Sequence, residues 1–130
     1  MIAEIAWRSP IKVSSVGELD AALDAIAAEV LPELPQAVPI TRANGDCLTV
    51  VLGAKAGSVL SFISKSGDPP YFVSLGDPIA KGTFTYFVVF DHHSESLACN
   101  VVSQAEARQA AREFVSQPPS LPKNVTWTEV

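Results

Sequence analysis

The sequence predicts an α+β fold, in which an antiparallel β-sheet meander carries two helices packed on one face. Two segments have the apolar spacing of amphipathic helices, and each begins with a Ser-x-x-Glu pattern, at Ser15 and at Ser103. Short segments rich in β-branched and aromatic residues lie before, between and after these helices. Gly, Pro or Asn-Gly turns separate them about every 10 residues, as expected for a meander.

The N-terminal part predicts a strand, a return strand and a helix. Residues 1–7 alternate in polarity, as a half-buried strand does, and residues 11–13 resume after a break at Pro10. The helix begins at Ser15 and ends before Pro32, because proline lacks the N–H donor and clashes with the preceding turn. Its apolar stripe consists of Leu19, Leu23, Ile26 and Val30.

The middle of the chain predicts consecutive strands. The pair Asn44-Gly45 indicates a hairpin turn whose two central residues have positive φ. Residues 83–91 are rich in aromatic and β-branched side chains, which favours a central strand there. The expected strands cover residues 38–43, 47–54, 58–64, 71–75 and 83–91.

A second helix and a last strand complete the predicted fold. The helix begins at Ser103 and ends before Pro118, and residues 124–130 form the strand. The large apolar side chains of these elements predict which residues are buried. The predicted core includes Leu23, Ile26, Phe87, Phe114 and Trp127.

The composition indicates one domain over residues 1–130. Apolar residues make up 48% of the chain, enough for a core, and no linker or repeat divides it. Acidic residues outnumber basic ones 14 to 9, a formal net charge of −5, and Lys and Arg do not cluster. These features disfavour direct binding of nucleic acid or of an anionic membrane. No apolar run reaches membrane-spanning length and no secretion signal is evident, so we expect a cytoplasmic protein.

No complete catalytic or cofactor motif is present, so we assign no catalytic residue, metal ligand or cofactor. One polar cluster, residues 91–95 with Cys99 nearby, contains half of a zinc-deaminase pattern but lacks its P-C-x-x-C half. We interpret the cluster as a polar loop joining two strands, and a small metal- or ligand-binding enzyme with a site around Asp91–Cys99 is the alternative. We expect Cys47 and Cys99 to be reduced, buried thiols, and a single disulfide between them is the alternative.

Several segments resemble, in order and spacing, the first family of immunity proteins from bacterial polymorphic toxin systems. Residues 71–78, YFVSLGDP, are similar to that family's aromatic strand ending in Gly-Asp. Residues 112–115 resemble its penultimate helix, and Pro119 with residues 125–127 resembles its closing proline and tryptophan strand. The segment 91–96 departs from the family pattern, because it lacks the Gly-containing acidic-aromatic turn.

The resemblance implies a non-enzymatic protein that binds a cognate toxin domain in the cytoplasm and occludes its active site. Members of this family are often encoded beside toxins that act on nucleic acids. The resemblance therefore implies a deaminase as the preferred partner and a nuclease as the second choice. Such toxins tend to carry basic substrate grooves, which an acidic chain would complement. A generic interaction domain without a toxin is a further reading.

The expected toxin contacts are exposed residues that carry charge or an aromatic ring. Alternation of turns along a meander predicts that the loop of Asp68 lies at the same end of the sheet as the turn at Asp91. Asp77 then lies at the opposite end as a structural turn residue, and the acidic face of the first helix is the alternative surface. The predicted toxin-binding residues are Asp68, Tyr71, Asp91, His92 and Glu95.

Overall fold

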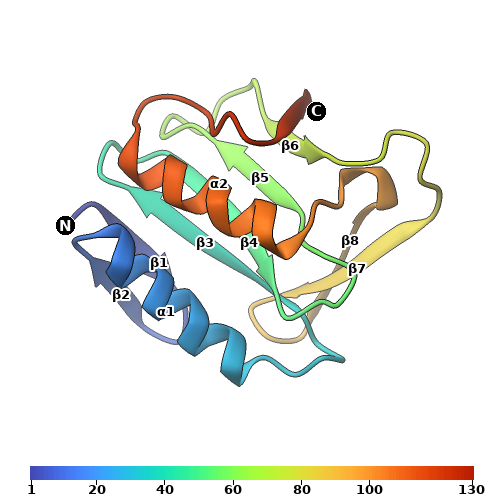
Figure 1. Ribbon diagram of the computed structural model, residues 1–130, viewed down its shortest axis with the longest axis horizontal. Helices are drawn as coiled ribbons and strands as arrows, with labels where there is room; N and C mark the ends of the chain where they lie inside the picture. The colour runs from blue at the N-terminus through green and yellow to red at the C-terminus, as the bar shows by residue number, and fades with distance from the viewer.

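The computed structural model describes all residues, Met1–Val130, and forms one nine-stranded sheet with two α-helices on one face (Figure 1). The main path of the sheet runs in the order β2-β1-β3-β4-β5-β6-β9, and β7 and β8 lie off this path. The predicted α+β class is therefore confirmed. The strands are β1 (Ala3–Ala6), β2 (Pro10–Val13), β3 (Gln36–Arg42), β4 (Cys47–Leu52), β5 (Leu60–Ile63), β6 (Phe72–Leu75), β7 (Thr83–Val88), β8 (His92–Leu97) and β9 (Thr126–Glu129).

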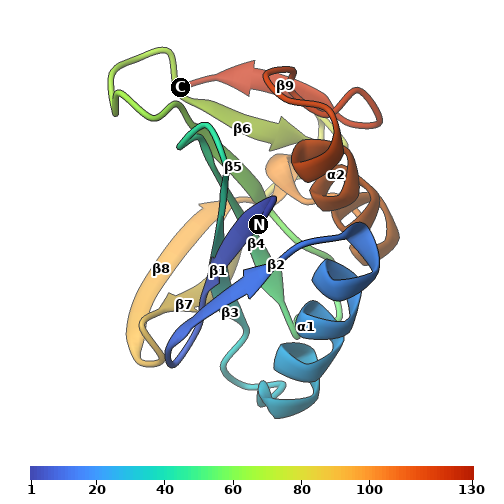
Figure 2. The same cartoon turned by 90° about the vertical axis from the view of Figure 1, so that its left-hand side faces the viewer.

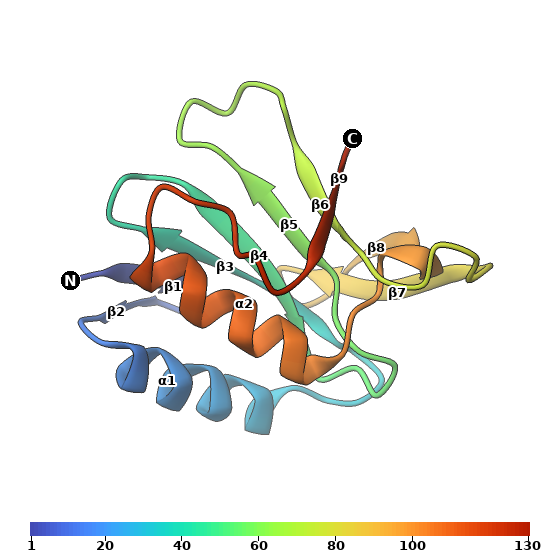
Figure 3. The same cartoon turned by 45° about the horizontal axis from the view of Figure 1, so that its top comes forward.

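The two helices, α1 (Val16–Glu29) and α2 (Gln104–Ser116), begin where the sequence predicts. At α2 the capping box is complete: the Ser103 hydroxyl accepts from the Glu106 N–H, and the Glu106 carboxylate accepts from the Ser103 N–H. At α1 the Ser15 hydroxyl caps the helix in the same way, but the Glu18 carboxylate reaches the N–H of Ser14. The helices lie side by side and run in opposite directions (Figures 1 and 3). Neither is long and apolar enough to cross a membrane.

The strands β3 to β6 form the predicted meander of antiparallel neighbours. The turn between β3 and β4 differs in detail from the prediction, because Gly45 has a positive φ of +96° and Asn44 does not. Arg42 and Asp46 close this turn through a backbone hydrogen bond of 3.0 Å, which leaves three residues between them. Three-residue loops of this kind need only one residue in the left-handed region, and Gly45 supplies it.

The main core lies between the sheet and the helices. Alternate residues of β3, such as Val38 and Ile40, are fully buried there. Leu23, Ile26 and Phe114 are buried as predicted. Trp127 is half-buried and packs against this core instead of lying inside it.

A buried arginine, Arg42, continues the inward-facing row of β3 and was not predicted. Its guanidinium lies 4.3 Å from the Phe114 ring centroid and pairs with the Asp46 carboxylate at 2.8 Å. It also donates to the backbone carbonyls of Phe114, Pro119 and Ser120. These bonds compensate the cost of burying the charge and tie the C-terminal end of α2 to the sheet.

The pKa of Asp46 is lowered from its ordinary value by this arrangement. Partial burial acts to raise it. That effect is outweighed by hydrogen bonds with the Arg42 side chain, the Lys65 N–H and the Asn44 side chain, and by the positive charge of Arg42. The carboxylate of Asp46 is therefore ionised over the ordinary pH range and holds Arg42 in place.

The strand predicted at residues 83–91 is present as β7, but the prediction that it is central is wrong. β7 ends at Val88, and β8 occupies residues 92–97, where the polar residues predict a loop. β7 pairs with β8 along its length but touches the main path only at Gln36↔Phe87, in parallel. Phe87 is accordingly half-buried, and the prediction that it belongs to the core is also wrong. The aromatic residues of β7 pack against a face of the sheet. Such packing raises β-propensity in the same way as a central position does, so the composition did not distinguish the two.

Candidate functional site

The face of the sheet away from the helices is covered only in part, by the β7–β8 hairpin (Figure 2). Phe84 of β7 is 7% exposed and packs against Val51 and Val59, which forms a small second core on this side. Beyond that contact the sheet presents small side chains. A groove of about 480 Å³ results, and its floor is made of Ala37, Pro39, Thr49 and Ser61.

The walls of this hairpin groove are apolar and aromatic. Tyr86, Val88, Val89 and Phe90 line one side of it, and Trp7 and Arg8 of the β1–β2 turn line its mouth. Arg8 is the only charged residue among those that line it. Such a surface suits an apolar anchor of a binding partner, because aromatic residues and arginine dominate binding energy at protein interfaces.

The hairpin tip is held against the main sheet by a set of specific contacts. The Phe90 ring lies 5.1 Å from that of Trp7, and the Arg8 guanidinium lies 5.0 Å from the Phe90 ring centroid. The Gln36 side chain donates to the Phe90 carbonyl at 3.0 Å and accepts from its N–H at 3.1 Å. Glu29, at the end of α1, accepts from the Trp7 indole at 2.7 Å. These contacts make the mouth of the groove a preformed feature.

The tip itself is strained. Val89 and Phe90 have φ values of +50° and +71°, in the region that favours glycine. The Asp91 N–H donates to the Val89 carbonyl at 2.9 Å across this turn. Residues held in such conformations cost on the order of 1–3 kcal/mol each and concentrate at binding sites. Val89 is also 68% exposed, so the strained turn presents an apolar side chain to solvent.

The structure divides the predicted toxin-binding residues between two ends of the molecule. Asp91 and His92 lie at the hairpin tip, with side chains 88% and 77% exposed, and Glu95 follows on β8 with 48% exposed. Asp68 and Tyr71 lie in the β5–β6 loop at the opposite end (Figures 1 and 2).

The prediction that both loops share one end of the sheet is therefore wrong. The β5–β6 loop lies beside the β3–β4 turn, where the Lys65 N–H donates to Asp46, whereas the hairpin tip lies beside Gln36, at the start of β3. Alternation of turns holds only along a continuous ladder, and the chain leaves that ladder after β6. The Asp77 carboxylate accepts from the Ile79 N–H at 3.1 Å, as a structural turn residue does.

The polar cluster of residues 91–99 does not converge on one point. Asp91 and His92 approach within 3.9 Å, as do His93 and Glu95, but these pairs are strung along β8. Cys99 lies beyond them in the 3₁₀ turn Ala98–Asn100. No group of three or more His, Cys, Asp or Glu residues is placed to hold a metal ion. Cys47 and Cys99 are both free, and both are half-buried where full burial was expected.

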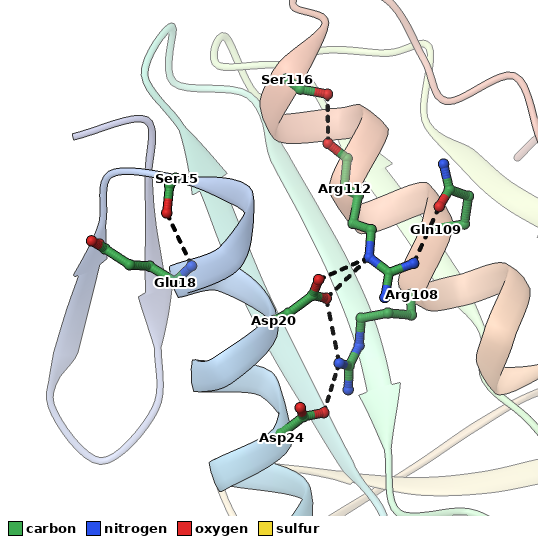
Figure 4. A network of polar contacts seen from close by, with 8 residues as sticks. All are labelled: Ser15, Glu18, Asp20, Asp24, Arg108, Gln109, Arg112 and Ser116. Carbon is green, nitrogen blue, oxygen red and sulfur yellow. Dashed lines mark hydrogen bonds and ion pairs between the residues drawn. The ribbon is translucent and has the colours of Figure 1, made fainter.

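The acidic side of α1, which the sequence offers as the alternative contact surface, pairs with α2 through Asp20 and Asp24 (Figure 4). The Asp20 carboxylate accepts from Arg112 Nε at 3.0 and 3.1 Å, and Asp24 accepts from Arg108 at 2.8 Å. These carboxylates are committed to the seam between the helices. The Asp20 side chain, 28% exposed, is less available to a partner than Asp91 or Glu95.

A protein-family model matches most of the chain. The chain belongs to a family of immunity proteins, which neutralise toxins. The family model, Immunity protein Imm1, matches residues 8–129, from the β1–β2 turn to the last residue of β9. The resemblance noted from the sequence is thereby confirmed. No curated protein sequence matches the chain.

Proposed function

We propose that the protein acts in the cytoplasm and neutralises the toxin domain encoded beside its own gene by occluding the active site of that toxin. The toxin is a nucleic-acid-targeting enzyme, a deaminase first and a nuclease second. Membership of the immunity-protein family supports a toxin as the partner. The observation that carries the choice of surface is the strained hairpin tip, because an exposed apolar turn beside a preformed groove serves recognition better than stability.

The contact surface that we propose comprises the hairpin groove and the adjoining β8. Trp7, Arg8 and Phe90 supply rigid anchors of the kind found at interface hot spots. Asp91 and Glu95 supply exposed carboxylates at the rim. Rim charges mainly set the association rate and its salt dependence, so they would steer a partner whose groove is basic.

The charge of the whole chain supports the choice of a nucleic-acid-targeting toxin. An enzyme that binds nucleic acid carries positive potential around its substrate groove, because phosphate contacts dominate its affinity. A protein with a net charge of −5 is attracted to such a groove and repelled by nucleic acid itself. Carboxylates at the hairpin tip can occupy positions that phosphates would otherwise take.

A matched pair of charge reversals tests this proposal. Asp91→Lys with Glu95→Lys alters the hairpin, and Asp68→Lys with Glu113→Lys makes the same charge change in the β5–β6 loop and on α2, away from the groove. We expect the hairpin variant to lose protection in cells that express the adjacent toxin domain, with unchanged thermal unfolding. Its affinity should also lose salt dependence relative to the unaltered protein. The control variant should protect fully.

Other outcomes would overturn parts of the proposal. Loss of protection by the control alone would move the interface to the β5–β6 loop or to α2. Failure of the unaltered protein to bind or neutralise the adjacent toxin domain would overturn the proposed function. Deaminated bases in the nucleic acid of unprotected cells would identify a deaminase, and strand breaks would identify a nuclease.

A further inference from the structure

We propose that β8 binds its partner by strand addition: an extended segment of the toxin pairs, edge to edge, with His92–Leu97. The identity of the partner rests on the proposed function. The hydrogen-bonding edge and its register follow from the structure alone. Strand addition supplies affinity through backbone hydrogen bonds and specificity through alternate side chains.

Three strands end the ladders of the sheet, and β8 is the least protected of them. β2 has only four residues and carries Pro10 and Lys12, which discourage pairing with another chain. β9 also has only four residues. β8 has six residues, contains neither proline nor lysine, and pairs only with β7. A long edge without these protective features is a site for strand pairing.

The orientation of the free backbone groups of β8 follows from one hydrogen bond of β7. The Phe87 N–H donates to the Pro35 carbonyl at 2.8 Å, on the side away from β8. Phe87 faces His93 in the antiparallel register, so this is a pair without mutual hydrogen bonds. The N–H and C=O of His93 must therefore also point away from β7, towards the free edge.

The same alternation extends along the strand. The Ala98 N–H donates to the Gly82 carbonyl at 2.9 Å, so the position just beyond Leu97 is a hydrogen-bonded one. Glu95 and Leu97 then fall, like His93, on positions whose N–H and C=O face outward. Three donor and acceptor pairs are thus presented at regular spacing, which is the pattern that an added antiparallel or parallel strand requires.

A second cleft, of about 390 Å³, lies beside this edge. Glu95, Ser96 and Leu97 line it from β8. Ser61 and Val73 of the main sheet also line it, together with Val130, which follows β9. Leu97 is 60% exposed there. Side chains on one face of an added strand have a place to enter, since successive side chains of a strand point to opposite faces.

Charge favours a strand of the toxin over a second copy of this chain. If two copies paired antiparallel so that all three outward positions were used, Glu95 would face Glu95, and like charges directly opposite one another destabilise a sheet. Each copy also carries a net charge of −5. A strand with basic residues opposite Glu95 and near Asp91 meets neither obstacle.

A proline substitution tests the backbone contribution separately from the side chain. Glu95→Pro removes one outward N–H, and the hydrogen bonds between β7 and β8 at the flanking positions stay in place. Glu95→Thr is the matched control, because it removes the same carboxylate and keeps the N–H. Against the purified toxin domain encoded beside the gene, we expect the Kd of Glu95→Pro to exceed that of Glu95→Thr by about tenfold or more.

A second measurement does not depend on the folding of the proline variant. Amide hydrogen exchange of the unaltered protein should slow at His93, Glu95 and Leu97 when the toxin domain binds. Equal Kd values for the two variants, or unchanged exchange at these amides in a complex that does form, would overturn strand addition. Failure of the unaltered protein to bind would instead overturn the proposed function. A dimer of the free protein that Glu95→Pro dissociates would assign the edge to a second copy and overturn the proposal.

Discussion

The two faces of the sheet differ in what their residues do. On the helix-covered face, Ile40, Leu23 and Phe114 are fully buried, and the buried Arg42 donates hydrogen bonds to the Asp46 carboxylate and to backbone carbonyls. On the open face, small side chains form the floor of a groove, and the adjoining hairpin exposes Val89 in a strained turn. The burial that stabilises the fold is concentrated on one side of the sheet, and the surface that we propose for recognition lies on the other.

This difference suggests how an immunity protein can change its partner without losing its fold. Substitutions of the exposed residues of the open face, outside the small core around Phe84, alter side chains that bury little area, so they cost little stability. The departure of residues 91–96 from the family pattern falls in this region. The comparison predicts that the two faces respond oppositely to substitution, and the following variants test that contrast from the largest expected effect to the smallest.

Phenylalanine-to-alanine substitutions on the two sides should differ in cost. Phe114→Ala removes a fully buried ring in contact with Arg42 and should lower the free energy of unfolding by about 3–5 kcal/mol. Phe87→Ala removes a half-buried ring of the hairpin and should cost about 1–2 kcal/mol. Urea unfolding of both variants measures the difference. Equal costs would mean that the hairpin is part of the main core.

The buried pair Arg42–Asp46 should make stability depend on pH in the acid range. The pKa of Asp46 is lowered in the folded protein, so its contribution is present above the unfolded pKa, near 3.8, and is lost as the pH falls through the folded pKa. Asp46→Asn should cost about 2 kcal/mol at pH 7. The difference from the unaltered protein should shrink below about pH 4. A difference that stays constant down to pH 2 would contradict this account.

Relief of the strained turn should separate stability from binding. Val89→Asn places a residue that tolerates the left-handed region at a φ of +50°, so the free energy of unfolding should rise by about 1 kcal/mol. The same change removes an exposed apolar contact and should weaken binding of the adjacent toxin domain. Thermal unfolding and calorimetric titration measure the two effects. A variant that is less stable and binds normally would remove the argument that strain serves recognition.

Much of the helix-covered side could be predicted from the sequence because its signals are local. The caps at Ser15 and Ser103 depend on residues three positions away, and the apolar stripe of α1 depends on helical spacing. The burial of Arg42 could not be predicted, because its partners Pro119 and Ser120 lie 77 and 78 residues further along the chain. Only its place in the inward-facing row of β3 could have indicated it.

The hairpin could not be predicted for a related reason. Its turn uses Val89 and Phe90 where a glycine or asparagine is usual, so the strand pattern continues without a visible break. Its position depends on the distant contacts of Phe90 with Trp7 and Gln36. The exposure of Asp91, His92 and Glu95 could be predicted from the sequence, but their separation from Asp68 and Tyr71 depends on where the hairpin docks.

The central claim, that the open face binds the toxin and the helix-covered face does not, is tested most directly by placing the same large side chain on each. Thr49→Arg fills the floor of the hairpin groove, and Ala25→Arg adds the same side chain to an exposed position of α1. The measurement is the Kd of each variant for the adjacent toxin domain. We expect Thr49→Arg to raise the Kd by about a hundredfold or more and Ala25→Arg to leave it unchanged. A raised Kd for Ala25→Arg together with an unchanged Kd for Thr49→Arg would contradict the account.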